Sequence, residues 1–583
     1  MTDLSLQNNA MVASQSSQYI SIVPENGEQF NPQQKIIYNI EPEIGYIKND
    51  SYIVFDVLNN SADKGRYTFQ KNLGAHAIID RVDIYSKETG ILLESNTNYG
   101  EWCNVLHQYL YDDNSNLQNS QGVGKPVQSW EHRVLPDANG ASTASRSLAS
   151  SIDIENNQLS PVNLDTDGGN GDTTGKAGGS PAYATRRFCI PLKVGLFGAY
   201  EGNVEKAIPV LNFGGLRIEI TLASAKKALQ PLCLTDIKLT NNNEANKKRH
   251  TDWLVGAINV VDGTDQRGNS TLELKISSGS TAAGFSASHL QDLGICFGNK
   301  MKWVGTNTAD AALTYTGTVS KMEGATAQDV IIDGNTKSVY QTMKITLDNI
   351  SPAAGANGVK PGLLTRVLDD CNYKVMNTEF RLKQIVAPPQ VADATMKGIN
   401  YEFLGYEVFM NNIPTGSMRH QIPINSVASK AVATFTILHD SSNGEGETYS
   451  SADVFNGILP DVANLNEVVY WINNKMYPLR AYNPQHKGDK CLALNELVKA
   501  FRACGLQPAN LGNMDFGNGE NYTNTPMICR ELAKSGFVFD LRNAEPELRL
   551  SFSATRANIL RANTFVFSKK IIQTTATGLQ VIH

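Results

Sequence analysis

The chain contains many short stretches in which apolar and polar residues alternate. In residues 216–222, Leu and Ile alternate with Arg, Glu and Thr, which predicts a β-strand with one buried face. Residues 432–437 and 548–552 alternate in the same way. Residues 53–55 and 565–567 are apolar throughout and predict strands covered on both sides. Short strands spread over the whole length, with turn signals between them, are typical of a β-sandwich or barrel.

Two stretches have the three-to-four spacing of an amphipathic helix. Residues 99–110 carry Tyr, Trp, Val and Leu at this spacing and are followed by three helix breakers, Asp-Asp-Asn. Residues 494–501 keep the same spacing, and Gly505 follows where a C-terminal cap belongs. We expect two single helices packed against sheets, with apolar residues in the core rather than around a cofactor. His107, on the first helix, is expected to be a partly buried packing residue.

Two stretches predict long loops. Residues 131–182 contain no aromatic residue and are rich in Ser, Asn, Gly, Asp and Ala, so they bury too little area to offset their ordering entropy. The second loop region covers about 305–358, with brief strand-like pieces. Residues 241–250 are polar except for one Ala and are the best candidate for a linker between two strand-rich halves.

The composition agrees with a turn-rich β-protein. At roughly 150 residues per domain, 583 residues correspond to about four domains or two large β-domains. Charged residues make up 19%, and the chain has 55 Asn, a residue that favours turns over helix interiors.

Charge and cysteine usage exclude several classes of protein. The net charge of −6 gives no global reason to bind nucleic acid, and residues 1–34 contain no Lys or Arg. The N-terminus lacks the charged start and apolar run of a secretory signal, and no run of 18 apolar residues predicts a membrane-spanning helix. We expect free, buried thiols in a reducing compartment, because no CxxC occurs among the eight cysteines, Cys103, Cys189, Cys233, Cys296, Cys371, Cys491, Cys504 and Cys529.

No motif predicts catalysis, a cofactor or a metal. The glycine-rich stretch 168–176 departs from the phosphate-binding loop, which needs Gly and Ser or Thr where Asn170 and Ala177 stand. His76, His107 and His132 are far apart in sequence, and neither HExxH nor GxSxG occurs. The basic run 247–249 is interpreted as part of a solvated connection rather than a nucleic-acid contact.

A family resemblance begins at Phe188–Phe197 and continues through Ala207–Val210 and Gly214–Leu222. These segments, in this order, resemble the first jelly roll of the double jelly-roll major capsid proteins of virophages, Polinton-like viruses and related icosahedral DNA viruses. Residues 79–85 are similar to an early strand of that family. The second half supports the resemblance with four further segments, Tyr470–Arg480, Phe537–Leu541, Leu548–Phe552 and Phe565–Ile572. The resemblance covers about 45–225 and 370–575.

The resemblance implies an all-β fold of two jelly-roll sandwiches side by side, with long loop insertions and few short helices. The expected division is an N-terminal arm at 1–34, a first jelly roll at 35–225 with an insertion at about 113–185, a linker at 226–250, and a second jelly roll at 251–583 with insertions at about 305–358. The arm is expected to contact protein rather than the genome.

The resemblance also implies a function. The chain would be the major capsid protein of a double-stranded DNA virus, made in the host cytoplasm and assembled as trimeric, pseudo-hexameric capsomers of the virion. Its partners would be further copies of itself and the penton and minor capsid proteins, without specific nucleic-acid binding or a transmembrane segment. Two alternatives remain open from the residues: a viral fibre or carbohydrate-binding adhesin, and a β-sandwich glycoside hydrolase.

Overall fold

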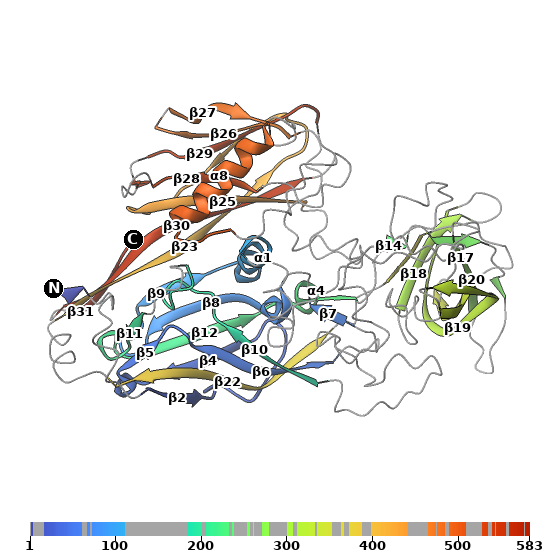
Figure 1. The fold of residues 1–583 in the computed structure, drawn as a ribbon, viewed down its shortest axis with the longest axis horizontal. Helices are drawn as coiled ribbons and strands as arrows, with labels where there is room; N and C mark the ends of the chain where they lie inside the picture. Colours follow the sequence, from blue (N-terminus) through green and yellow to red (C-terminus); the bar gives the residue numbers. More distant parts are fainter. Residues whose placement is uncertain are drawn as a thin grey trace.

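The computed structural model consists of two β-sandwiches and a separate third sheet (Figure 1). The residues that the structure describes are 2–3, 17–60, 67–69, 73–110, 185–200, 206–231, 236–237, 253–256, 260–261, 271–278, 300–306, 312–332, 335–351, 363–366, 372–386, 398–440, 465–473, 475–483, 489–508, 527–533, 539–542, 544–555, 559–575 and 578–583. Strands of both sandwiches run roughly horizontally in Figure 1, with the second sandwich above the first.

The first sandwich packs a four-stranded sheet against a seven-stranded one. The four-stranded sheet has the order β4 (Lys35–Ile40), β12 (Leu216–Leu222), β8 (Ile79–Ser86) and β9 (Leu92–Asn96). The facing sheet has the order β10 (Thr185–Pro191), β6 (Tyr52–Asn59), β22 (Tyr373–Ile385), β5 (Tyr46–Lys48) and β11 (Ala207–Pro209), with β2 (Ser17–Ile22) and β3 (Gln29–Phe30) along β22. A small pair, β7 (Tyr67–Phe69) and β13 (Leu229–Pro231), lies beside them.

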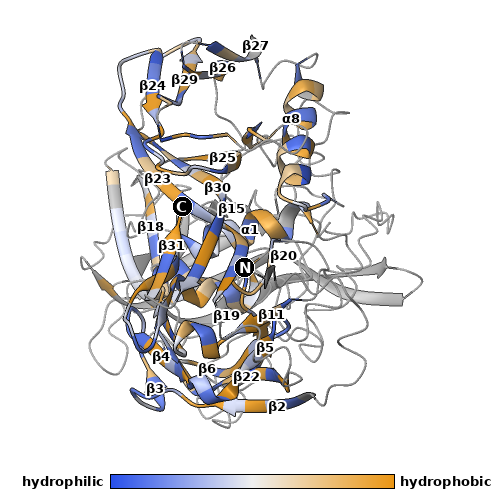
Figure 2. Ribbon diagram, turned by 90° about the vertical axis from the view of Figure 1, so that its left-hand side faces the viewer, coloured by the Kyte–Doolittle hydropathy of each residue, from blue (hydrophilic) through white to orange (hydrophobic). Residues whose placement is uncertain are grey.

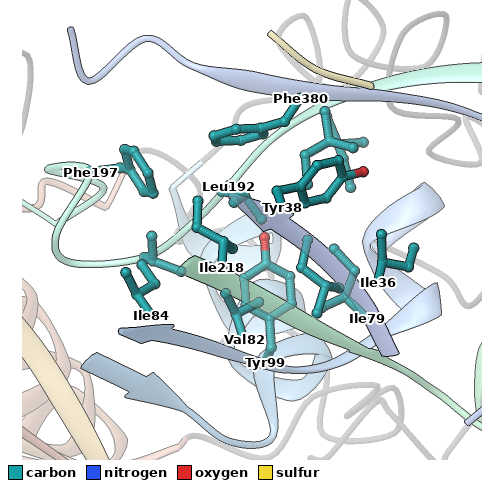
Figure 3. Close-up of a cluster of buried hydrophobic side chains, with 14 of the residues drawn as sticks. Ile36, Tyr38, Ile79, Val82, Ile84, Tyr99, Leu192, Phe197, Ile218 and Phe380 are labelled. Atoms are coloured by element: carbon teal, nitrogen blue, oxygen red, sulfur yellow. The ribbon is translucent and has the colours of Figure 1, made fainter. Parts of the chain in front are cut away.

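The core of the first sandwich follows from the alternation in its strands. In β12 the Leu and Ile residues point inward and are buried, as the sequence predicts. Figure 3 shows Ile218 of this strand beside Tyr99, Val82 and Tyr38, which come from three other elements.

The second sandwich has the strand order of a jelly roll. One sheet runs β23 (Ile399–Ile413), β30 (Leu560–Thr575), β25 (Ala431–Asp440) and β28 (Ile528–Glu531), with β1 (Thr2–Asp3) beside β23 and β31 (Gly578–Ile582) beside β30. The other runs β24 (Arg419–Pro423), β29 (Glu547–Phe552), β26 (Leu465–Ile472) and β27 (Lys475–Tyr482). Counted from β23, the eight main strands therefore lie in the orders 1-8-3-6 and 2-7-4-5, two interlocked sheets of a jelly roll. The predicted all-β fold with two sandwiches is confirmed.

The third sheet corrects the predicted loops. Its order is β14 (Asp236–Ile237), β21 (Leu363–Arg366), β18 (Lys300–Thr306), β19 (Ala312–Ile332), β20 (Asn335–Ser351), β17 (Thr271–Ser278) and β15 (Trp253–Gly256), with β16 (Val260–Val261) beside β17. The long hairpin of β19 and β20 occupies most of the region predicted as loops at 305–358. Trp303 and Tyr315 stack on neighbouring strands and are buried, so this sheet has a small core of its own.

Strand pairing also corrects the predicted domain boundaries. The third sheet lies in sequence between β13 and β22, and both of these strands belong to the first sandwich, so residues 236–366 are an insertion into it. The second sandwich begins only at β23 rather than at residue 251. The pairing of β22 depends on which sheet can bury its side chains. Its position in the sequence, after the third sheet, therefore did not reveal that its partners lie in the first sandwich.

Two further boundaries differ from the prediction. Within the predicted arm at 1–34, β2 and β3 hydrogen-bond to β22 and are part of the first sandwich. Within the predicted linker at 226–250, α4 (Ala225–Ala228) and β13 contribute the buried Ala228 and Leu229 to the same core.

Both predicted helices are confirmed. They are α1 (Tyr99–Tyr109) and α8 (Lys490–Ala503), and Gly505 follows α8 with a φ of +72°, a left-handed conformation that glycine adopts without strain. Short 3-10 turns occur at η1 (Pro42–Ile44), η2 (Gly74–Ile78) and η6 (Leu211–Phe213). In Figure 2, hydrophobic and hydrophilic residues alternate along α8.

The predictions of which faces of individual strands are buried are largely confirmed. The apolar runs 53–55 in β6 and 565–567 in β30 are buried throughout, as expected. The prediction of one buried face for 432–437 is wrong, because Thr434 and Thr436 are buried as well. The Thr436 hydroxyl lies 3.3 Å from the Tyr470 hydroxyl of the opposite sheet, so β25 is covered on both faces.

Several sequence predictions lie outside the described residues. They concern the loop 131–182 with its glycine-rich stretch, the polar segment 241–250 with its basic run 247–249, His132 and three of the cysteines. Of the five cysteines that the structure describes, none forms a disulfide; Cys103, Cys504 and Cys529 are buried, whereas Cys189 and Cys491 are exposed. Across the described part of the chain, no helix has both the length and the apolar character needed to cross a membrane.

Candidate functional site: the junction between the two sandwiches

Helix α1 connects the two sandwiches because adjacent parts of its apolar face enter two different cores. Tyr99 and Cys103 belong to the core of the first sandwich, where Figure 3 shows Tyr99 pointing in among aliphatic side chains. Trp102, Leu106 and Tyr109 belong instead to a cluster that includes β23, β25, β30 and α8 of the second sandwich. The polar residues Glu101, Asn104 and His107 of α1 are buried together with its apolar ones, so both sandwiches and the elements around them enclose the helix.

Trp102 lies at the centre of the cluster on the second sandwich. Its ring centroid is 4.6 Å from that of Phe567, 5.1 Å from Phe435 and 5.3 Å from Phe565. Tyr200 and Tyr406 complete the contact from either side of the junction, at 6.4 and 6.0 Å. Aromatic side chains bury the largest areas of any residues, so this cluster holds the sandwiches together mainly by apolar burial.

A buried carboxylate fixes the segment that follows β10. Glu94 of β9 accepts hydrogen bonds from the backbone N–H of Gly195 at Oε1 (2.8 Å) and of Leu196 at Oε2 (2.7 Å). Burial raises the pKa of Glu94, although the N–H of Leu196 and the charge of Lys570 act in the opposite direction. Both oxygens thus have donors, as a buried acceptor requires.

The same segment touches the second sandwich directly. A Cβ on Gly195 would lie 2.0 Å from the carbonyl oxygen of Leu404 in β23, so only glycine permits this approach. The Tyr401 hydroxyl donates to the carbonyl oxygen of Leu196 at 2.9 Å. Two further tyrosines hold Lys193, whose backbone N–H donates to Tyr99 and whose carbonyl accepts from Tyr200.

Polar contacts at the rim of α1 extend the junction. The Asn563 side chain of β30 donates to the carboxylate of Glu101 at 2.9 Å, and both residues are buried. The Tyr406 hydroxyl donates to the carbonyl oxygen of Thr97 at 3.3 Å, just before the helix begins. Apolar and directional contacts together hold the two sandwiches against each other.

The outward faces of the first sandwich carry ion pairs. Asp56 accepts from Arg187 at 2.7 and 3.0 Å and from Asn377 at 2.8 Å. Burial alone would raise the pKa of Asp56, but these hydrogen bonds lower it below its ordinary value. On the other sheet Glu219 pairs with Lys35 and Arg217.

The structure brings together two of the histidines that sequence spacing kept apart. His76 of η2 and His107 of α1 meet with ring centroids 5.1 Å apart, and both are buried. His107 is thus a packing residue, as predicted, and more fully buried than expected. Among the described residues, no group of three His, Cys, Asp or Glu side chains is arranged to hold a metal ion.

Sequence reasoning missed the junction itself. Gly195 and Leu196 lie within the segment Phe188–Phe197 that carries the family resemblance, and the apolar stripe of α1 is visible in its three-to-four spacing. Neither signal identifies Leu404 or Asn563 as the partner, because both lie hundreds of residues away in sequence.

Comparison with known proteins gives similarity in structure only. No family model matches the chain, and no curated protein matches its sequence. Among solved structures, VP54 of PBCV-1 is 10% identical over 98% of this chain and 97% of its own, with a TM-score of 0.46. The Faustovirus major capsid protein is 10% identical over 96% and 90%, with a TM-score of 0.47. The mavirus major capsid protein is 9% identical over 97% and 90%, with a TM-score of 0.34.

The chain is similar to viral major capsid proteins over nearly its whole length. These similarities are distant. The fold of this chain is defined by its own strand pairing and by the junction between its two sandwiches.

Proposed function

We propose that the chain is the major capsid protein of an icosahedral double-stranded DNA virus, and that three copies form a pseudo-hexameric capsomer. The observation that carries the proposal is the packed junction, in which Gly195, Leu404 and Trp102 hold two sandwiches side by side. Three such pairs around a threefold axis present six similar sandwiches, a block that tiles a closed shell. A flexible joint would vary the spacing of the six sandwiches and prevent regular tiling.

The remaining features are consistent with a structural role. The order of the segments between Phe188 and Leu222 resembles that of capsid proteins, and the neighbours in structure include proteins named as major capsid proteins. We assign no catalytic, cofactor or metal residue to the chain. Its proposed location is the capsid shell of the virion, with further capsomers and the penton and minor capsid proteins as partners, and without specific contact to the genome.

Light scattering on the recombinant protein at micromolar concentration tests the proposal. We expect a mass of about 191 kDa, three times the 63.6 kDa of the chain, because flanks of obligate trimers bury more than about 2,000 Å². Negative-stain images should show near-hexagonal particles. A stable, folded monomer would contradict the proposal, and a glycan panel would then separate an adhesin, which binds saturably, from a hydrolase, which turns its substrate over.

A further inference from the structure

His76 is a buried imidazole with an incomplete set of partners. It lies in η2 without exposed surface, and its Nδ1 is 3.1 Å from the hydroxyl of Tyr99. Its Nε2 is buried and has no hydrogen-bond partner among the described residues. The ring of His107 packs edge-on against it, at an interplanar angle of 77°. Two titratable rings therefore touch at the contact between η2 and α1.

Among the described residues around His76, no unpaired carboxylate is available to stabilise the protonated form of its ring. The described ionisable side chains on the elements packed against η2 are Tyr99, Glu101, Cys103, His107 and Tyr109 of α1, Arg187 and Cys189 of β10, Lys193 after it, Lys226 and Lys227 of α4, and Asp80, Arg81, Asp83 and Tyr85 of β8. Each carboxylate in this set already has a partner: Asp80 has Lys227, Asp83 has Arg81 and Glu101 has Asn563. The charges that act on His76 are those of His107 and Lys193, and both are repulsive to an imidazolium.

Acid therefore destabilises the folded state through the protonation of His76. Burial, and then the charges of His107 and Lys193, lower the pKa of His76 well below its ordinary 6.5. An unfolded chain binds this proton at about pH 6.5, whereas the folded chain excludes it. The stability that the neutral ring contributes is fully present above pH 6.5 and is lost as the pH falls below it.

We propose that the His76–His107 pair is an acid-sensitive latch that releases η2 from α1 and so loosens the junction between the two sandwiches. The coupling is direct, because α1 presents His107 to η2 and Trp102 to the second sandwich. The latch is a property of the single chain and holds whether or not the chain builds a capsid. Acidification would open the molecule at its junction, before the strands of either sandwich separate.

Hydrogen exchange on the full-length protein tests the latch. The amides of residues 99–110 are compared at pH 7.5 and 5.0, after correction for the intrinsic exchange rate. We expect faster exchange at pH 5.0, by up to about thirtyfold, the limit for one imidazole of pKa 6.5 whose proton only the open state binds. His76→Gln keeps a polar side chain without the titration and should reduce this acid response several-fold. His420→Gln, a change at a histidine of β24 far from η2 in the pairing of strands, should leave it unchanged.

Three results would overturn the latch. One is equal exchange of α1 in the wild-type protein at both pH values. Another is an acid response in His76→Gln equal to that of the wild type, since the ring would then only fill space. If His76→Gln does not fold at pH 7.5, His76→Asn is measured instead, and a response equal to the wild type again contradicts the proposal.

Discussion

Gly195 lies against the backbone of Leu404, with room for a hydrogen atom but not for a methyl group. The contact joins the segment after β10 of the first sandwich to β23 of the second. Glu94 fixes it from one side through the N–H of Gly195, and Trp102 packs nearby through the aromatic cluster. The relative position of the two sandwiches therefore depends on a few residues whose substitution has definite consequences.

Gly195→Ala should destabilise the protein by roughly 3 kcal/mol or more, because the added Cβ meets backbone that cannot rotate away. Gly90→Ala is the matched control: Gly90 has a φ of +69° but open space around it, so only backbone strain of about 1–2 kcal/mol applies. Urea unfolding measures both. Equal losses in the two variants would show that the approach to Leu404 does not matter.

Trp102→Ala should cost about 3–5 kcal/mol, the usual loss for a large buried aromatic side chain. The sandwiches should also become separable, so limited proteolysis should cleave between them sooner than in the wild type. Leu92→Ala, at a side chain that is 41% exposed, should change stability by no more than about 0.5 kcal/mol. A wild-type cleavage pattern in Trp102→Ala would contradict the role given to the cluster.

Glu496 and Arg530 form a buried ion pair between α8 and β28. Arg530→Met should cost up to about 3–5 kcal/mol because it leaves the buried carboxylate with only the half-exposed Lys499 as a partner. The double variant Glu496→Leu with Arg530→Met should recover most of that loss, since it buries no charge. Denaturant unfolding of the two variants checks this. If the double variant is no more stable than the single one, the loss arises from packing rather than from the charge.

Glu219 should make stability dependent on acid pH. Burial alone would raise the pKa of Glu219, but Lys35 and Arg217 outweigh it and hold that pKa below its ordinary 4.5. A lowered carboxylate pKa stabilises the folded state above pH 4.5, and this contribution is lost as the pH falls through the folded value. Urea unfolding from pH 7 to pH 3.5 should show a smaller fall for Glu219→Gln than for the wild type. Glu41→Gln, which removes the carboxylate of the mostly exposed ion pair with Lys87, is the matched control for the loss of one surface charge.

Replacement of residues 141–178 by a short Gly-Ser linker should leave the protein folded and its oligomeric mass, less the deleted residues, unchanged. The reason is compositional: this stretch has no aromatic residue with which to contribute to a core. Light scattering and thermal unfolding of the variant test the expectation. Aggregated protein after the replacement would assign the stretch to a core or an interface.

The sequence predicted strands and helices well where one pattern extended over several residues. The alternation in 216–222, the apolar run 565–567 and the spacing of α1 each matched the structure because local side-chain periodicity determines which face is buried. The prediction for β25 was wrong because it placed its threonines on an exposed face. A threonine hydroxyl can be buried when a partner such as Tyr470 forms a hydrogen bond with it.

By itself, the sequence determined that this chain forms β-sandwiches with two packed helices, because these features depend on contacts within a strand or a helix. Only the tertiary structure decided that β22 joins the first sandwich, that residues 236–366 are inserted into it, and that Gly195 meets Leu404. Those contacts join residues separated by roughly two hundred or more positions, such as Tyr52 and Arg381 in β6 and β22. Partners so far apart are chosen by competition among all the sheets for apolar surface, and no local pattern records the outcome of that competition.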